Sequence, residues 1–269
     1  MISTQIASAL NILVPAWNLQ DVRYLAYLEG GYSNENHRLA YQDQTYVLRI
    51  PGRTQPWVDR RHEGQYLSRV RRPLAIPPTA FDEASGLMLS PWVEGTLLVD
   101  AWARFDNGDL IDYLHALHGA LPVDTRVYDV DLLVSMYTGD ARTAERTPRD
   151  RSSVDRVCHN DLNPWNVIVT PDRGWVTLDW ESVGLNDPLF DLVGLHQGLG
   201  LPAMELNDLA RAYLNSAGRE IDERLHRARV NFWRREWAWA EYQIKAGDQR
   251  AEIATQRDIA KARLSELKV

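Results

Sequence analysis

Three polar side chains in the second half of the chain have the types and spacing that phosphoryl transfer requires. Asp161 and Asn166 lie five residues apart in the segment HNDLNPWN at 159–166, and Asp179 follows thirteen residues later. Transfer from ATP needs a carboxylate near the acceptor hydroxyl and hard oxygen ligands for Mg²⁺. The D-x-x-x-x-N spacing is that of a kinase catalytic loop. We therefore predict that Asp161 is the catalytic carboxylate and that Asn166 and Asp179 bind the metal.

A short hairpin is expected to return the chain so that Asp179 can face Asn166. Residues 167–169 and 175–178 have the character of two strands, and the segment TPDRG at 170–174 joins them. Proline presets φ and glycine accepts a positive φ, which is good turn chemistry. The alternative is that these polar residues only cap loops, but His159 and a second aspartate at this distance favour the catalytic interpretation.

The first hundred residues contain a candidate phosphate anchor. Arg49 lies in YVLRI at 46–50, where a protein kinase carries its phosphate-binding lysine. Arginine can hold phosphate oxygens and a carboxylate together through its fork. Glu63, fourteen residues later on a predicted helix over 57–70, is the expected ion-pair partner. The alternative for Glu63 is a solvated helix face beside Arg60 and Arg61.

An arginine is needed at this anchor because lysine is almost absent from the chain. The three lysines, Lys245, Lys261 and Lys268, all lie in the last 25 positions. A fixed positive charge elsewhere must therefore come from arginine.

Two further segments are expected to contact the nucleotide. In the polar glycine loop at 29–36, Gly31, Ser33 and Asn34 are predicted to cover the phosphates with backbone N–H groups and short side chains. Residues 90–94 look like a hinge, where Trp92 and Val93 would contact the base mainly through the backbone. Such contacts leave open whether the donor is ATP or GTP.

The pattern of apolar residues and turns predicts an α+β protein with a two-lobed, protein-kinase-like fold. A strand is expected at 22–28, a hairpin over 37–50 and another through the turn at 82–86, so the first hundred residues should hold strands with one helix. After about residue 96 the chain should be mostly helical apart from the hairpin at 167–178. The expected lobes are a β-rich nucleotide-binding lobe at 1–92 and a helical catalytic and acceptor-binding lobe at 93–269.

Composition narrows the class of protein. A net charge of −7 argues against nucleic acid as the main partner and is compatible with a cationic substrate. No apolar run approaches the roughly 18 residues of a membrane helix, and the first residues lack the features of a signal peptide. The single cysteine, Cys158, cannot form an internal disulfide and should be a small buried side chain. We expect a cytoplasmic protein with no membrane partner.

Four segments together resemble the choline kinase and thiamine kinase group of the aminoglycoside phosphotransferase superfamily. They are GGYSNEN at 30–36, YVLRIPG at 46–52, HNDLNPWN at 159–166 and LDWE at 178–181. The resemblance covers the chain from about residue 22 to the C-terminal helices. One departure is Ser182, where the family commonly has tyrosine.

The resemblance implies a two-lobed kinase-like fold that uses ATP and Mg²⁺. It implies that Asp161 is the catalytic base, that Asn166 and Asp179 are metal ligands, and that Arg49 pairs with Glu63.

The segment FWRREWAWAEYQIKA at 232–246 is a candidate acceptor site. Trp233 and Trp237 are four residues apart and should share a helix face, with Glu241 one turn further. Such a face could hold a quaternary ammonium or thiazolium cation by cation–π contact. Choline kinases resemble this in having a tryptophan-rich C-terminal helix, and thiamine kinases in a Trp-x-Glu-Tyr stretch. The alternatives are an aromatic stripe in the core, or Trp165 as the wall of the acceptor site.

The leading hypothesis is thus a small-molecule kinase whose acceptor is a hydroxylated, cationic molecule such as choline, ethanolamine or thiamine. An aminoglycoside- or sugar-directed kinase and a nucleotide-binding pseudokinase scaffold are the alternatives.

Three further polar residues are expected to have structural roles. Asp187 should cap a helix starting at Pro188, Asp191 should brace the catalytic loop, and His118 should be structural.

Overall fold

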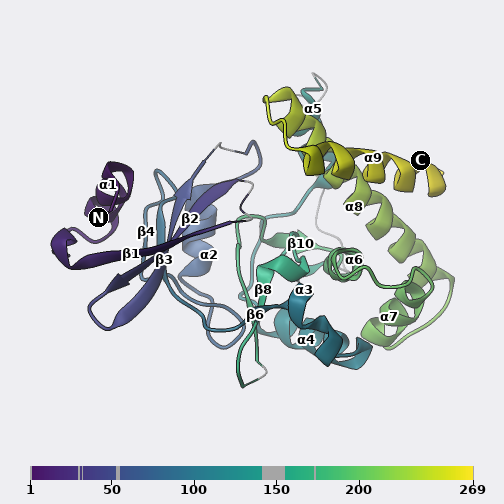
Figure 1. The fold of residues 1–269 in the computed structure, drawn as a ribbon. Coiled ribbons are helices and arrows are strands. Elements are labelled where there is room, and N and C mark those ends of the chain that lie inside the picture. The colour runs from purple at the N-terminus through teal and green to yellow at the C-terminus, as the bar shows by residue number, and fades with distance from the viewer. Residues whose placement is uncertain are drawn as a thin grey trace. The chain divides into compact units, whose positions relative to one another are not determined.

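The computed structural model describes residues 2–29, 31, 33–52, 55–140, 155–172 and 174–268, and divides the chain into two compact units. The first unit comprises Met1–Leu97 and Val167–Glu181, and the second comprises Leu98–Asn166 and Ser182–Val269. Each unit is therefore built from two separate stretches of chain (Figure 1). Gly30, Tyr32 and Arg173, which belong to the motifs above, lie outside the described residues.

The first unit is built on a five-stranded antiparallel sheet in the order β1-β2-β3-β5-β4. Its elements are α1 (Thr4–Leu13), a 3₁₀ turn (Leu19–Asp21), β1 (Val22–Leu28), β2 (Asn34–Tyr41), β3 (Gln44–Pro51), α2 (Arg60–Leu67), β4 (Ala80–Phe81), β5 (Met88–Pro91), β6 (Thr96–Leu97), β8 (Val167–Val169) and β9 (Trp175–Thr177).

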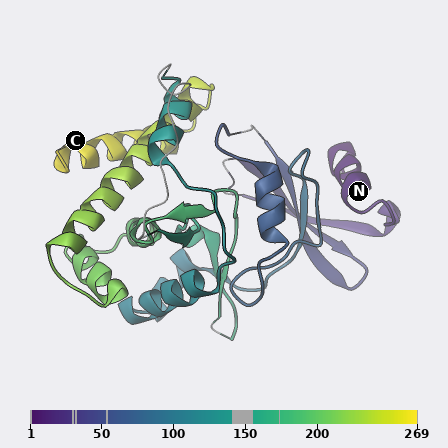
Figure 2. The same ribbon diagram turned by 180° about the vertical axis from the view of Figure 1, so that it is seen from behind.

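Alternation along β3 assigns its side chains to two different environments. Tyr46, Leu48 and Ile50 belong to a buried apolar cluster that also contains Leu10 of α1. Arg49 lies between them in sequence, so its side chain points to the opposite face of the sheet. On that face it meets Glu63 of α2, the helix drawn against the sheet in Figure 2. The period of two residues thus separates the apolar core of this unit from its charged face.

A small three-stranded sheet, in the order β6-β8-β9, completes the first unit. The β8–β9 hairpin pairs Val167 with Thr177 and Val169 with Trp175, and the backbone N–H of Thr170 donates to the carbonyl of Gly174 at 2.8 Å across the turn. The chain leaves β9 and reaches Asp179, whose φ of 60° lies in the left-handed region. This residue therefore belongs to the unit that contains Arg49.

The second unit is mostly helical. Its elements are α3 (Leu98–Ala101), a 3₁₀ turn (Trp102–Arg104), α4 (Asn107–Ala120), α5 (Val130–Thr138), β7 (Arg156–Cys158), a 3₁₀ turn (Pro164–Asn166), β10 (Gly184–Asn186), α6 (Leu189–Gly198), α7 (Glu205–Leu214), α8 (Arg219–Lys245) and α9 (Ala251–Glu266).

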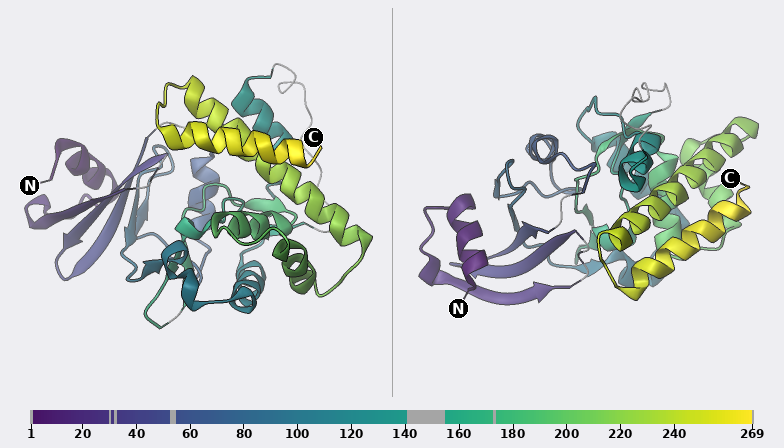
Figure 3. Two further views of the ribbon diagram at one scale, coloured as in Figure 1. Left: turned by 45° about the vertical axis from the view of Figure 1, so that its right-hand side comes forward. Right: turned by 90° about the horizontal axis from the view of Figure 1, so that it is seen from above.

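The longest helix of this unit, α8, packs against α5, α6, α7 and α9. Helix α9 runs back alongside it (Figure 3), and α5 and α6 pack against it as well. Tyr137 of α5 and Tyr242 of α8 have ring centroids 5.4 Å apart. Among the described helices, none combines the length and the apolar character that crossing a bilayer demands.

The structure confirms the predicted α+β class, the strand at 22–28 and the hairpins at 37–50 and 167–178. Two expectations were wrong. The first hundred residues contain α1 in addition to α2, and the later part of the chain contains β6 and the β7–β10 pair besides the hairpin. The predicted helix at 57–70 is shorter, because the Asp59 side chain accepts a hydrogen bond from the His62 N–H and caps α2 at Arg60.

Candidate active site

The first unit contains a buried, bidentate ion pair. The Nη1 and Nη2 atoms of Arg49 lie 2.6 and 3.0 Å from the two carboxylate oxygens of Glu63. The exposed fraction of the side chain is 4% for Arg49 and 0% for Glu63. The structure therefore brings together the two residues whose spacing predicted a pair, in the fork-to-fork geometry that favours arginine over lysine.

Three more charged residues extend this pair into a network. Nη1 of Arg60 lies 2.7 Å from Glu63 and 2.8 Å from Glu181, and Nη1 of Arg49 lies 3.6 Å from Asp179. Two guanidinium groups and three carboxylates give the network a formal charge of −1. A phosphate group approaching such a network is repelled unless a cation accompanies it. Arg60 and Glu181 were not predicted as site residues.

The ion pair between Arg49 and Glu63 keeps both side chains charged. Burial alone would raise the pKa of the Glu63 carboxyl, but Arg49 and then Arg60 hold that pKa below its usual value. Burial alone would lower the pKa of the Arg49 guanidinium, but Glu63, Asp179 and Glu181 raise it. Both groups are therefore charged in the folded protein.

The predicted phosphate loop is tightly folded where it can be described. A Cβ atom on Gly31 would lie 2.3 Å from the carbonyl oxygen of Asn34, so only glycine fits there. The carbonyl of Ser33 accepts a hydrogen bond from the N–H of Gly52 at 2.9 Å. The Asn34 side chain is buried, with its amide oxygen 3.5 Å from Nη2 of Arg60, so it reaches the charged network.

At the predicted hinge, one backbone donor is already engaged. The N–H of Trp92 donates to the carbonyl of Thr45 at 2.9 Å, so it is not free to bind a nucleobase. The Trp92 ring lies 4.0 Å from the guanidinium carbon of Arg38. The Trp92 carbonyl and the backbone of Val93 remain as the predicted contacts to the base.

In the second unit, Asn160 orders the loop that carries Asp161. Asn160 has a φ of 64°, and its amide nitrogen lies 3.1–3.2 Å from the carbonyls of Cys158, Ser182 and Gly184. Its amide oxygen accepts a hydrogen bond from Asn186 at 2.9 Å. Asparagine tolerates the left-handed conformation better than other non-glycine residues, and its short amide can satisfy several buried groups.

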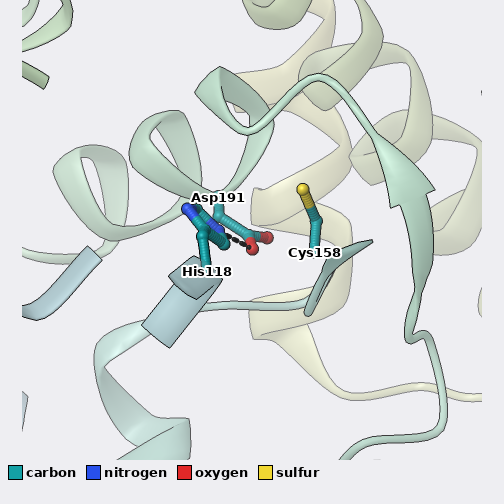
Figure 4. A group of neighbouring side chains, drawn as sticks. All are labelled: His118, Cys158 and Asp191. Atoms are coloured by element: carbon teal, nitrogen blue, oxygen red, sulfur yellow. Dashed lines mark hydrogen bonds and ion pairs between the residues drawn. The ribbon is translucent and has the colours of Figure 1, made fainter. Parts of the chain in front are cut away.

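Asp191 of α6 braces the same loop, as the sequence led us to expect. Its two carboxylate oxygens accept hydrogen bonds from the N–H groups of His159 and Asn160, both at 2.8 Å. His118 of α4 lies 3.0 Å from the same carboxylate (Figure 4). The other ring nitrogen of His118 lies 2.7 Å from the hydroxyl of Tyr213.

Cys158 lies beside this pair, and the three side chains could be mistaken for a metal site. Burial, and secondly the Asp191 carboxylate, raises the pKa of the Cys158 thiol well above its usual value. The Asp191 carboxylate accepts hydrogen bonds from two backbone N–H groups, and both ring nitrogens of His118 are engaged with Asp191 and Tyr213. The group is a structural brace, which agrees with the roles expected for His118 and Cys158.

Helix α6 packs closely against the catalytic loop. A Cβ atom on Gly194 would lie 2.5 Å from the carbonyl oxygen of Leu162, so the helix can approach the loop only through glycine. At the start of this helix, Asp187 accepts a hydrogen bond from the Leu189 N–H at 3.1 Å and pairs with Arg224 at 2.9 Å. Asp187 therefore accepts the first N–H of α6, but the helix begins at Leu189 and not at Pro188 as expected.

The loop presents Asp161 and Asn166 together. The Asn166 amide nitrogen lies 3.0 Å from the Asp161 carbonyl and 3.4 Å from its carboxylate oxygen Oδ2. Among the described residues the Asn166 amide oxygen accepts no hydrogen bond. It has the character of a ligand for a hard cation.

An unpredicted residue, Arg235 of α8, contacts the proposed catalytic carboxylate. Its Nη1 atom lies 2.8 Å from Oδ1 of Asp161, and its Nη2 atom lies 2.8 Å from Glu236. Burial raises the pKa of the Glu236 carboxyl, Arg235 opposes this effect, and the Asp161 carboxylate adds to it. Arg235 and Glu236 lie inside the tryptophan-rich segment, where only the aromatic residues and Glu241 had been singled out.

The candidate acceptor residues lie in different environments. Trp233 is 5% exposed and packs edge-on against Phe232, so it is a core residue and we do not carry it forward as a cage wall. Trp237 is partly buried, and within the described chain its indole N–H has no hydrogen-bond partner. Glu241 lies 3.3 Å from Lys261. Trp165, in the catalytic loop, is 53% exposed.

Replacing Glu63 by glutamine should lower the free energy of unfolding by about 3 kcal/mol, near the lower end for a broken buried ion pair, because Asp179 still faces Arg49. Denaturant unfolding measures this. The control is Glu83→Gln, since Glu83 is half exposed and lies 3.9 Å from Arg61; we expect a change within about 0.5 kcal/mol. Equal stability of the two variants would contradict a supporting role for the pair.

Comparison with known proteins agrees with this geometry. A relative is protein LicA of Haemophilus influenzae, which is 26% identical over 213 residues, or 71% of this chain and 62% of that protein. The match therefore spans somewhat less than two thirds of LicA; in a second strain it covers 78% of the protein.

Two solved structures share the fold. The choline kinase LicA from Streptococcus pneumoniae has a TM-score of 0.71 at 17% identity, covering 97% of this chain and 98% of that one. A ternary complex of streptomycin, ATP and the aminoglycoside phosphotransferase APH(2")-IIa has a TM-score of 0.57 at 13% identity, covering 100% of this chain and 99% of that one.

The model of the phosphotransferase enzyme family, APH, matches residues 25–233, which include Arg49, Glu63, Asp161, Asn166 and Asp179. The protein belongs to this phosphotransferase family.

Proposed function

We propose that the protein is a kinase that transfers the γ-phosphoryl group of ATP to a hydroxyl of a small, cationic molecule, with Mg²⁺ as cofactor. The observation that carries this proposal is the Asp161–Asn166 pair, held on a loop that Asp191 and Asn160 brace from two sides. A carboxylate beside an amide oxygen is what an acceptor hydroxyl and a metal require at this position of a kinase.

The charged network of the first unit supports binding of ATP together with a metal. Arg49 is held by Glu63 and by the Gly86 carbonyl, and its contribution to phosphate binding would be its positive charge beside Asp179. Because the network carries a formal charge of −1, a polyphosphate binds there more readily with a divalent cation. Asp179 and Asn166 offer the carboxylate and amide oxygens that Mg²⁺ prefers, and the bound ion would neutralise charge on the phosphates.

In the proposed reaction, Asp161 orients the acceptor hydroxyl and receives its proton. The acceptor oxygen forms a bond to the γ-phosphorus while the bond from that phosphorus to the β–γ bridging oxygen breaks. The products are the phosphorylated acceptor and ADP. This chain's own contribution is to position the hydroxyl, hold the phosphates and take the proton.

A choline-type cation is the acceptor that the site favours. Trp165 is 53% exposed in the loop that carries Asp161, and Trp237 lies partly buried on α8, the helix that also carries Arg235. Aromatic faces beside carboxylates bind quaternary ammonium groups well. The likeness to the Streptococcus pneumoniae choline kinase points the same way, while ethanolamine, thiamine and aminoglycosides are the acceptors to be compared with choline.

Replacing Asp161 by asparagine should lower kcat by roughly 10²–10⁴-fold and leave the Kd for ATP nearly unchanged, because the amide cannot accept the proton. Steady-state kinetics and calorimetry measure the two quantities. The control is Asp208→Asn, a change of an exposed aspartate on α7. A variant that kept more than about a tenth of the wild-type kcat would remove Asp161 from the reaction.

Replacing Asp179 by alanine should raise the Mg²⁺ concentration needed for half-maximal activity, and by more than Asn166→Ala does, because the carboxylate carries charge. Magnesium titrations of activity at fixed ATP test this, with Asp43→Ala in the exposed β2–β3 turn as the control. An unchanged requirement in the Asp179 variant would show that this residue does not bind the metal.

Replacing Trp237 by leucine should raise the KM for choline, with a cost of about 0.5–2 kcal/mol, if the ring faces the cation. The neutral isostere 3,3-dimethylbutan-1-ol should lose little affinity in the same variant. The same change at the core residue Trp233 is the control, and there we expect lower thermal stability with KM unchanged. If the Trp237 variant keeps the wild-type KM, Trp165 becomes the next aromatic residue to test.

A further inference from the structure

We propose that Arg235 is a positioning residue for phosphoryl transfer: it holds Oδ1 of Asp161 so that Oδ2 is left to receive the acceptor hydroxyl. This inference rests on the proposed function, because Asp161 must be the carboxylate that meets the acceptor. It assigns a role to a side chain that the motif does not contain and that lies 74 residues further along the chain.

The contacts of Asp161 distinguish its two oxygens. Oδ1 accepts a charge-assisted hydrogen bond from Nη1 of Arg235 at 2.8 Å. Oδ2 lies 3.4 Å from the Asn166 amide nitrogen, a long and weak contact. A carboxylate oxygen can accept more than one hydrogen bond, so Oδ2 retains the capacity to bind a hydroxyl. With Oδ1 fixed, the carboxylate cannot rotate, and the position of Oδ2 is fixed as well.

Two aromatic rings and a second carboxylate restrict the position of the Arg235 side chain. Its side chain is 13% exposed, and its guanidinium carbon lies 5.7 Å from the Phe190 ring and 5.6 Å from the Phe232 ring. Nη2 lies 2.8 Å from Glu236, whose other carboxylate oxygen accepts a hydrogen bond from Gln256 of α9 at 2.6 Å. The chain of contacts therefore runs from α9 through α8 to the catalytic loop, and it can hold a functional side chain within a narrow range of positions.

Arg234, the neighbouring arginine on α8, does not share the contact that Arg235 makes with the catalytic loop. Arg234 pairs with Asp131 of α5, and among the described residues it forms no ion pair with the catalytic loop. Arg235 needs no second carboxylate to balance its charge, since Glu236 already does so.

The test compares Arg235→Met, Arg235→Lys and Arg234→Met with the wild type. Turnover of Mg-ATP is measured with choline, ethanolamine, thiamine, kanamycin and water as acceptors, and the acceptor used fastest by the wild type is kept. Arg235→Met should lower kcat about 10–100-fold, the range for a misplaced reacting group, with the KM for ATP and for acceptor within about twofold. Arg235→Lys should recover part of kcat, because it keeps the charge without the fork. Arg234→Met should leave kcat unchanged.

Loss of Arg235 also leaves Glu236 buried without its cation, so Arg235→Met could fold poorly. The double variant Arg235→Met with Glu236→Gln removes both charges and should show the same loss of kcat. A second readout is the effect in an Asp161→Asn background. Because Arg235 acts through Asp161, Arg235→Met should cause no further loss of residual activity there.

The outcomes separate this inference from the proposed function. If Asp161→Asn is fully active, or if the wild type transfers phosphate to none of these acceptors, the proposed function is wrong and the inference falls with it. If Asp161→Asn is inactive but Arg235→Met keeps the wild-type kcat, the inference alone is wrong. A loss that multiplies with that of Asp161→Asn, or that the Arg234→Met control shares, would also overturn it.

Discussion

A charge taken out of water must be paired, and this constraint shapes the charged cluster of each unit. In the first unit, the Glu63 carboxylate is completely buried and is tolerated because Arg49 and Arg60 both contact it. In the second unit, the buried Arg235 lies between Asp161 and Glu236. The groups proposed to meet ATP and the acceptor are thus held in place by the same contacts that make their burial possible.

The catalytic loop is rigid because its buried backbone groups must also find hydrogen-bond partners. The N–H groups of His159 and Asn160 are buried and must be satisfied, and the Asp191 carboxylate satisfies both. The Asn160 amide in turn satisfies the carbonyl of Gly184 on β10. Asp161 therefore extends from a loop whose backbone has few alternative conformations, which is what a preorganised site needs.

Much of this could be predicted from the sequence, because some constraints act over short and fixed spacings. The D-x-x-x-x-N motif, the turn chemistry of the hairpin and the alternation that turns Arg49 away from the apolar face of β3 are all local. The contacts of Arg60 and Arg235 are not local: each depends on a carboxylate 74 or more residues away, so each arginine looked like an ordinary charged residue on a helix. The short strands β7 and β10 were missed because three residues show no periodicity.

The central claim is that the γ-phosphoryl group of ATP is moved to an alcohol. Phosphorus NMR of Mg-ATP incubated with the protein and with choline, ethanolamine, thiamine or an aminoglycoside follows that group directly. The account predicts that the γ-phosphate signal is lost while one new phosphomonoester signal and an equal amount of ADP appear. Formation of AMP and pyrophosphate, or unchanged ATP with every acceptor, would contradict it.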